Sequence, residues 1–229
     1  MMQTTIEVPD RVKAHALLRA LNAELLNHDS ATLTLERWCE ARGLASPARI
    51  VAERRLGSHV EPSLEQRRLL GVSTTDPIRY RRVRLRCGDC VVSKADNWYV
   101  PARLTAAMNR ELDTTDVAFG RAVRSLKFRR RTLSSRFLWS PRLPAEGADE
   151  GLGADLARPV IPPQVLVHTA VLTLPDGTPF SYLVETYTRE VLALRSLRRP
   201  SEAAAANDSN VRVRRRRWHL SQACTEPIA

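Results

Sequence analysis

Two runs of residues in the carboxy-terminal part of the chain are typical of a β-hairpin, and they constrain the fold more than any other feature. VLVHTAVLTL and PFSYLVETYT are rich in β-branched and aromatic residues and flank Pro-Asp-Gly-Thr at residues 175–178. Asp-Gly is a strong signal for a tight turn between antiparallel strands. In residues 78–101, Val83, Leu85 and Cys87 alternate with arginines before Gly-Asp-Cys and a second apolar run. This period of two predicts a second hairpin.

Helical patterns precede the strands. Apolar residues at helical spacing from Val12 predict an amphipathic helix that ends near His28, and a second helix is expected to begin after Asp29 or Ser30 and to stop at Gly43. Residues 102–113 are helix-prone, and residues 128–139 have a strand pattern. Helices followed by adjacent antiparallel strands predict an α+β fold with a single antiparallel sheet and packed helices.

The length of 229 residues favours one domain with appendages. We expect that domain to span residues 1–194, with a mobile surface loop at about 142–160, where Pro, Gly and acidic residues replace any periodicity. Residues 195–229 read as a basic, disordered tail, because arginines there surround a stretch with nothing to bury. Much of the net charge of +11 is local to this tail.

Composition and motifs exclude several classes of protein. No apolar run reaches the roughly 18 residues of a membrane span, and the amino terminus has no secretory-signal pattern, so we expect a cytoplasmic protein with reduced thiols. Cys87 and Cys90 form a CxxC without a second ligand pair, which indicates a turn with two thiols rather than a zinc site. The five histidines are scattered, and GxSxG, GxxxxGK[ST] and GxGxxG are absent, so we expect no metal.

Glu185 lies inside LVETY, in the middle of a predicted strand. Such a carboxylate either faces solvent or is held in an apolar pocket, and the second arrangement raises its pKa and suits it to acid–base chemistry. Arg82, Arg84 and Arg86 share one face of their strand and can grip a carboxylate bidentately. The alternative is a solvated basic face, and the pattern does not say which arginine turns inward.

The segment RYRRVRLRCGDCVVSKADNWYVP resembles the central hairpin of the chorismate–pyruvate lyases. Asp29-Ser30-Ala31-Thr32, Phe119-Gly120-Arg121 and LVETYT follow in the order of that family, so the resemblance covers roughly residues 10–192. The fold it implies, chorismate lyase-like, is shared with UTRA-type effector-binding domains. The chain differs at Asp96-Asn97, where the family tends to carry Gly-Arg.

The resemblance implies a carbon–oxygen lyase of bacterial type that converts chorismate to 4-hydroxybenzoate and pyruvate, without a cofactor, in ubiquinone-type precursor biosynthesis. By position it places the carboxylate-binding arginine on Arg82 and the essential acid on Glu185, both catalytic, with Ala31, Phe119 and Gly120 as further ligand contacts. The ligand expected is a small anionic aromatic or pre-aromatic molecule, chorismate or hydroxybenzoate.

Two alternatives belong to other classes. The same fold would serve a non-catalytic domain that binds a small aromatic acid as an effector, although the amino terminus shows no convincing helix-turn-helix pattern. The run from Arg212 to Arg217, with Trp218 beside it, would give at most salt-sensitive, sequence-independent attachment to nucleic acid.

Overall fold

The structure, a computed structural model, describes residues 5–7, 11–55, 57, 59–140 and 161–196. The chain divides into two compact units, residues 1–6 with 196–229, and residues 7–195. The short strands β1 (Thr5–Glu7) and β8 (Leu194–Ser196) fall at this division, and all that follows concerns the second unit. The predicted mobile loop at 142–160 lies outside the described residues, as does the predicted tail beyond residue 196.

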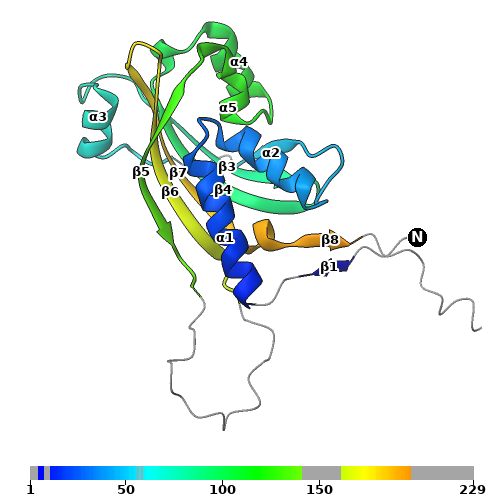
Figure 1. Cartoon of the computed structure of the whole chain (residues 1–229). Helices are drawn as coiled ribbons and strands as arrows, with labels where there is room; N and C mark the ends of the chain where they lie inside the picture. Colours follow the sequence, from blue (N-terminus) through cyan, green and yellow to red (C-terminus); the bar gives the residue numbers. More distant parts are fainter. Residues whose placement is uncertain (1–4, 8–10, 56, 58, 141–160, 197–229) are drawn as a thin grey trace, which may run out of the picture. The chain divides into compact units, whose positions relative to one another are not determined.

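One antiparallel sheet organises the second unit (Figure 1). Its strand order is β2-β3-β4-β7-β6-β5. The strands are β2 (Ile50–Arg54), β3 (Arg79–Cys87), β4 (Cys90–Tyr99), β5 (Arg129–Phe137), β6 (Gln164–Thr173) and β7 (Pro179–Thr188). Every neighbouring pair is antiparallel.

Both predicted hairpins are present because their turn residues suit the turns. Gly88 and Gly177 have φ of 55° and 89°, a region that glycine enters without the steric penalty of a side chain. Asp176 accepts a hydrogen bond from the Thr178 backbone N–H at 2.8 Å, which closes the second turn through a local side-chain contact.

The described helices are α1 (Arg11–Leu26), α2 (Ala31–Ala41), α3 (Leu64–Leu70), α4 (Ala106–Thr114) and α5 (Phe119–Ala122), with 3₁₀ turns η1 (Pro101–Arg103), η2 (Arg124–Leu126) and η3 (Arg189–Leu192). The two predicted amino-terminal helices are confirmed as α1 and α2. Ser30 caps α2 by accepting from the Leu33 backbone N–H at 3.3 Å. None of the helices in the described ranges is long and apolar enough to cross a membrane.

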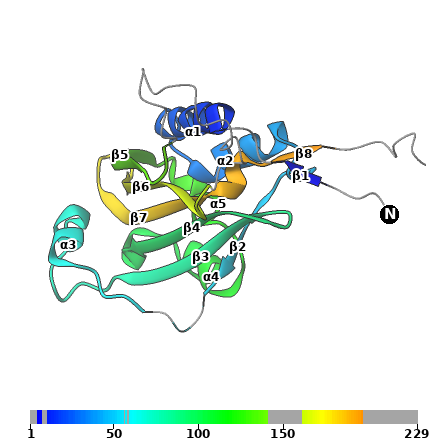
Figure 2. The same cartoon turned by 90° about the horizontal axis from the view of Figure 1, so that it is seen from below.

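The sheet and helices form the α+β fold with a single antiparallel sheet that the sequence predicts. In both views α1 and α2 lie on one side of the sheet, while α3 stands apart from them, near β7 (Figures 1 and 2). Leu18, Leu21, Leu25 and Leu35 from α1 and α2 are fully buried in one apolar cluster with the inward faces of the strands. A second cluster joins α4 to the far ends of β4, β6 and β7.

Candidate functional site

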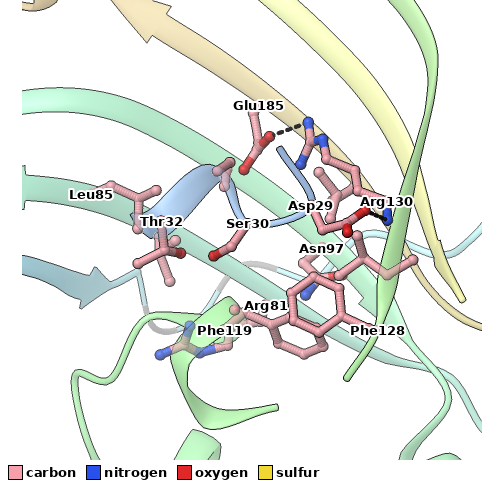
Figure 3. A pocket seen from close by; sticks show the side chains of 16 residues that line it. Asp29, Ser30, Thr32, Arg81, Leu85, Asn97, Phe119, Phe128, Arg130 and Glu185 are labelled. Atoms are coloured by element: carbon pink, nitrogen blue, oxygen red, sulfur yellow. Dashed lines mark hydrogen bonds and ion pairs between the residues drawn. The ribbon is translucent and has the colours of Figure 1, made fainter. Parts of the chain in front are cut away.

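A pocket lies where the two apolar clusters meet, on the helix-covered face of the sheet (Figure 3). It has a volume of about 50 Å³, several times the roughly 10–15 Å³ that one water needs. Its walls come from the start of α2, from α5 and from strands β3 to β7. The lining residues are Asp29, Ser30, Ala31, Thr32, Arg81, Val83, Leu85, Ala95, Asn97, Phe119, Gly120, Phe128, Arg130, Leu172, Leu183 and Glu185.

Glu185 and Arg130 form a buried ion pair in the wall of this pocket. The Arg130 Nη2 atom lies 2.6 Å from Glu185 Oε2, and the two side chains are 3% and 9% exposed (Figure 3). The Tyr187 hydroxyl donates to the same oxygen at 3.1 Å. Burial lowers and the Glu185 charge raises the pKa of Arg130, with a net rise, so the Arg130 guanidinium stays protonated.

Arg81 brings a second guanidinium into the pocket from β3. It shares the inward face with Val83 and Leu85, is 8% exposed, and donates from Nη2 to the Val117 carbonyl oxygen at 2.9 Å. Within the described residues it forms no ion pair, and burial lowers its pKa to about 10. The guanidinium therefore stays protonated at neutral pH while carrying a desolvated charge without a carboxylate against it.

Three donors around the pocket have no partner among the described residues. They are the Nε atoms of Arg81 and Arg130 and the Nδ2 atom of Asn97, all buried. The other amide atom of Asn97, Oδ1, accepts from the Ser181 hydroxyl at 2.6 Å. Buried polar groups are nearly always paired in folded proteins, so three unpaired donors around one cavity indicate a site for a ligand rich in acceptors.

The start of α2 adds to this cationic side. Asp29 Oδ1 accepts from the Arg130 backbone N–H at 2.8 Å (Figure 3), and this bond holds the beginning of the helix against β5. Ala31 and Thr32, the first helical residues, line the pocket. The amino end of a helix carries partial positive charge and favours an anion.

The opposite walls are apolar. Phe119 from α5 packs against Tyr99 and Phe180, with ring centroids 5.3 and 6.3 Å apart. Phe128 and Leu172 complete this side. The pocket thus offers donors to one end of a ligand and hydrocarbon to the other, the usual division in small-molecule sites.

Of the residues that the sequence predicts for the site, Glu185, Ala31, Phe119 and Gly120 line this pocket together. Arg82 does not. It lies on the outer face of β3, where its Nε donates to Asp96 Oδ1 at 2.6 Å with the side chain 45% exposed. The catalytic roles of Glu185 and Arg82 stay predictions.

Sequence reasoning missed Arg81, Arg130 and Asn97. Arg81 had a readable signal, because it is in phase with the apolar residues Val83 and Leu85 and therefore on their face of the strand. Arg130 and Asn97 have no such local signal.

A buried histidine lies behind the ion pair. His168 on β6 is directly opposite Glu185 in the register of β6 and β7. Its Nε2 atom is 2.7 Å from Asn22 Oδ1, while Nδ1 is buried without a partner among the described residues. Desolvation lowers the pKa of His168 to about 4, so this ring is neutral at physiological pH.

The CxxC residues face each other at the end of the β3–β4 hairpin. Cys87 and Cys90 are buried in the first apolar cluster, together with Cys39 of α2. Over the part of the chain that the structure describes, no group of three or more His, Cys, Asp or Glu side chains is placed to hold a metal ion.

Fold and pocket together define the class: an α+β protein whose single antiparallel sheet carries a pocket lined by two arginines, two carboxylates and apolar side chains. No family model matches the sequence. The chain is 55% identical over 186 residues to the uncharacterized protein y4mC of Sinorhizobium fredii, an alignment that covers 80% of this chain and 78% of that protein. The chain belongs to the family of y4mC.

Several solved structures are similar to this chain at low sequence identity. PhnF from Mycobacterium smegmatis is 15% identical, with 77% of this chain and 71% of that chain covered and a TM-score of 0.48. The effector domain of PhnF is 16% identical, with 70% and 88% covered and a TM-score of 0.46. A GntR-family transcriptional regulator from Enterococcus faecalis is 15% identical, with 59% and 93% covered and a TM-score of 0.37.

These comparisons correct one prediction. The expectation of a lyase acting on chorismate, with 4-hydroxybenzoate and pyruvate as products in ubiquinone-type precursor biosynthesis, is wrong: the solved structures named above are PhnF, its effector domain and a GntR-family transcriptional regulator. The geometry agrees with the correction. Glu185 points into the pocket while Arg82 pairs with Asp96 outside it, so the two residues assigned to that reaction do not share a cavity.

Proposed function

We propose that this chain is a non-catalytic binding domain for a small organic acid, with an aromatic acid as the best match, and that the bound acid acts as an effector. The carboxylate of the acid lies between Arg81, Arg130 and Asn97, and its hydrocarbon part packs against Phe119 and Phe128. The cationic and apolar sides of the pocket match the two ends of such a molecule.

The observation that carries the proposal is the set of unpaired buried donors. The Nε atoms of Arg81 and Arg130 and the Nδ2 atom of Asn97 lack partners among the described residues, and a buried donor without a partner destabilises a protein by about 1–3 kcal/mol. A carboxylate offers about four lone-pair sites. It can therefore satisfy all three donors and neutralise the unpaired charge of Arg81.

The state of Glu185 favours binding over catalysis. Its Oε2 atom accepts from both Arg130 and Tyr187, so this oxygen is committed to holding the Arg130 side chain in place. We assign Glu185 as a positioning residue that orients one of the two guanidinium groups. The ion pair also offsets the charge of Arg130, and the Asp29 carboxylate of the lining accepts from the Arg130 backbone N–H. Arg81 is then the cation of the lining that forms no ion pair among the described residues, and we assign it the selection of an anion.

The test compares an acid with its neutral analogue. Isothermal titration calorimetry at pH 7 would measure benzoate, cyclohexanecarboxylate and benzamide against the full chain. We expect at least one acid to bind and benzamide to bind at least about tenfold more weakly, because a hydrogen bond to a charged group contributes about 1.5–3 kcal/mol. Equal affinity for benzoate and benzamide, or no binding by any monocarboxylate in a wider panel, would refute the proposal.

A further inference from the structure

A second and larger cavity opens at the other side of Arg81. It is a cleft of about 340 Å³ between the end of β2, the start of β3 and the end of α4. Among the described residues, five arginines and one carboxylate, Asp113, line it. The arginines are Arg54, Arg55, Arg79, Arg81 and Arg82.

The arginines of this cleft are held in place without being fully engaged. Arg79 Nη1 pairs with Asp113 at 2.6 Å and Arg82 Nε pairs with Asp96 at 2.6 Å. Each guanidinium carries five N–H donors, and the side chains of Arg79 and Arg82 are 46% and 45% exposed. Each ion pair fixes one edge of the guanidinium, so other donors remain for a ligand in the cleft.

An aromatic wall orients this cluster. The Arg82 guanidinium carbon lies over the Tyr80 ring, 5.8 Å from its centroid, and the Tyr80 hydroxyl donates to Asp96. The same carboxylate therefore holds both the ring and the cation. Cation–π contact and a shared acceptor keep Arg82 at the cleft rather than free in solvent.

We propose that this cleft is a second anion site, which meets the acid pocket at Arg81, and that it binds a phosphate group, either free or as a monoester. Arg79 and Arg82 supply bidentate contacts, and Arg54, whose Nε atom lies 3.8 Å from Asp116 Oδ1, supplies a third guanidinium. A carboxylate has two oxygens, which one or two arginines satisfy, whereas a phosphate dianion has three or four oxygens and suits several guanidinium groups at once. The number of arginines therefore selects phosphate over carboxylate.

Phosphorus-31 NMR titration of the full chain with inorganic phosphate tests the site. The paired variant Arg79→Gln with Arg82→Gln should weaken phosphate binding at least about tenfold. The matched control is Arg84→Gln with Arg86→Gln, which removes the same charge from the same strand at arginines that pair with Glu53 outside the cleft. That control should change binding by less than about twofold.

The outcomes separate this site from the acid pocket and from general attraction of anions. Benzoate binding measured in parallel should persist in the Arg79→Gln/Arg82→Gln variant. A result that refutes the phosphate site is therefore distinguishable from one that refutes the acid pocket. Phenyl phosphate binding more tightly than inorganic phosphate would identify a monoester as the source, and the reverse order would identify free phosphate. The proposal would be overturned by an equal loss of phosphate affinity in both variant pairs, or by tighter binding of succinate than of phosphate. It would also be overturned if a DNA duplex bound more tightly than phosphate and lost the same affinity in both variant pairs.

Discussion

The buried ion pair of Arg130 and Glu185 leads to a prediction that distinguishes a structural role of Glu185 from a catalytic role. Replacing Glu185 by Gln keeps an oxygen that can accept from Arg130 but removes the negative charge. Arg130 would then be a second buried guanidinium of the pocket lining without an ion pair, with the more distant Asp29 charge still acting on it. The variant should lose stability and gain affinity for an anion.

The magnitude follows from the burial of the pair. With the two side chains 3% and 9% exposed, removing one partner costs about 3–5 kcal/mol, and the retained amide oxygen favours the lower end. For a domain of this size about 3 kcal/mol corresponds to a fall in Tm of about 6–12 °C. Benzoate affinity should rise at least about fivefold, because the pocket loses a negative charge.

The assay is a double-mutant cycle with chemical denaturation of wild type, Glu185→Leu, Arg130→Met and the pair Arg130→Met/Glu185→Leu, with Glu185→Gln measured beside it. We expect the pair to be more stable than either single variant, because well-packed apolar side chains often replace a buried ion pair without loss. Additive losses, or a change below about 1 kcal/mol for Glu185→Gln, would refute the reasoning. An unchanged benzoate affinity in a folded Glu185→Gln protein would contradict its electrostatic half.

Three further predictions test other parts of the account. Between pH 6.5 and 4 the unfolded chain binds a proton at His168 that the folded chain does not bind, because the pKa of His168 in the folded chain is about 4. The free energy of unfolding should therefore fall by up to about 3 kcal/mol as the pH drops through this window. Urea titrations of His168→Gln should show a flatter pH dependence over the same range. Gly120→Ala places a Cβ 3.1 Å from Thr32 Oγ1, so calorimetry should show benzoate affinity reduced at least about fivefold by overpacking, while the better helix propensity keeps thermal stability within about 1 kcal/mol. Arg81→Met should be as stable as wild type within about 1 kcal/mol in denaturant titrations, because it removes a buried unpaired charge along with one hydrogen bond; a loss above 3 kcal/mol would show that Arg81 is a structural residue.

The fold was predictable where the decisive chemistry is local. The turn residues Asp176-Gly177 and Gly88-Asp89 predict the two hairpins, and Ser30 predicts the start of α2. Strand β2 and helix α3 were not predicted. Helix α3 had a readable signature, since Ser63 and Gln66 form a capping box and Gly71 ends the helix; β2 is a five-residue strand that pairs only with β3, which leaves little for a pattern to show.

The sequence predicted some of the pocket residues and missed others, and the missed residues have a physical explanation. The alternation of Arg82 and Arg84 with Val83 and Leu85 predicts that these two arginines face away from the apolar side of the strand. Arg81 is the arginine that is in phase with the apolar side. The family resemblance placed the role one residue later, on the wrong face of the strand for this pocket.

The partner of Glu185 could not be found in the sequence. Arg130 and Glu185 are 55 positions apart along the chain, and in the sheet their strands β5 and β7 are separated by β6. The position of the unpaired Nδ2 atom of Asn97 depends in the same way on the register of β4 against β7. Such contacts follow from strand order and register, for which single-residue patterns carry no information.

Neighbouring arginines on β3 give the most direct test of the central claim, that an acid binds on the inward arginine. Arg81→Met and Arg82→Met remove the same group from adjacent positions, one inside the pocket and one outside it. Benzoate titration by calorimetry should show at least about a tenfold loss in Arg81→Met and less than about a twofold change in Arg82→Met. Equal losses in the two variants, or a loss confined to Arg82→Met, would contradict the account.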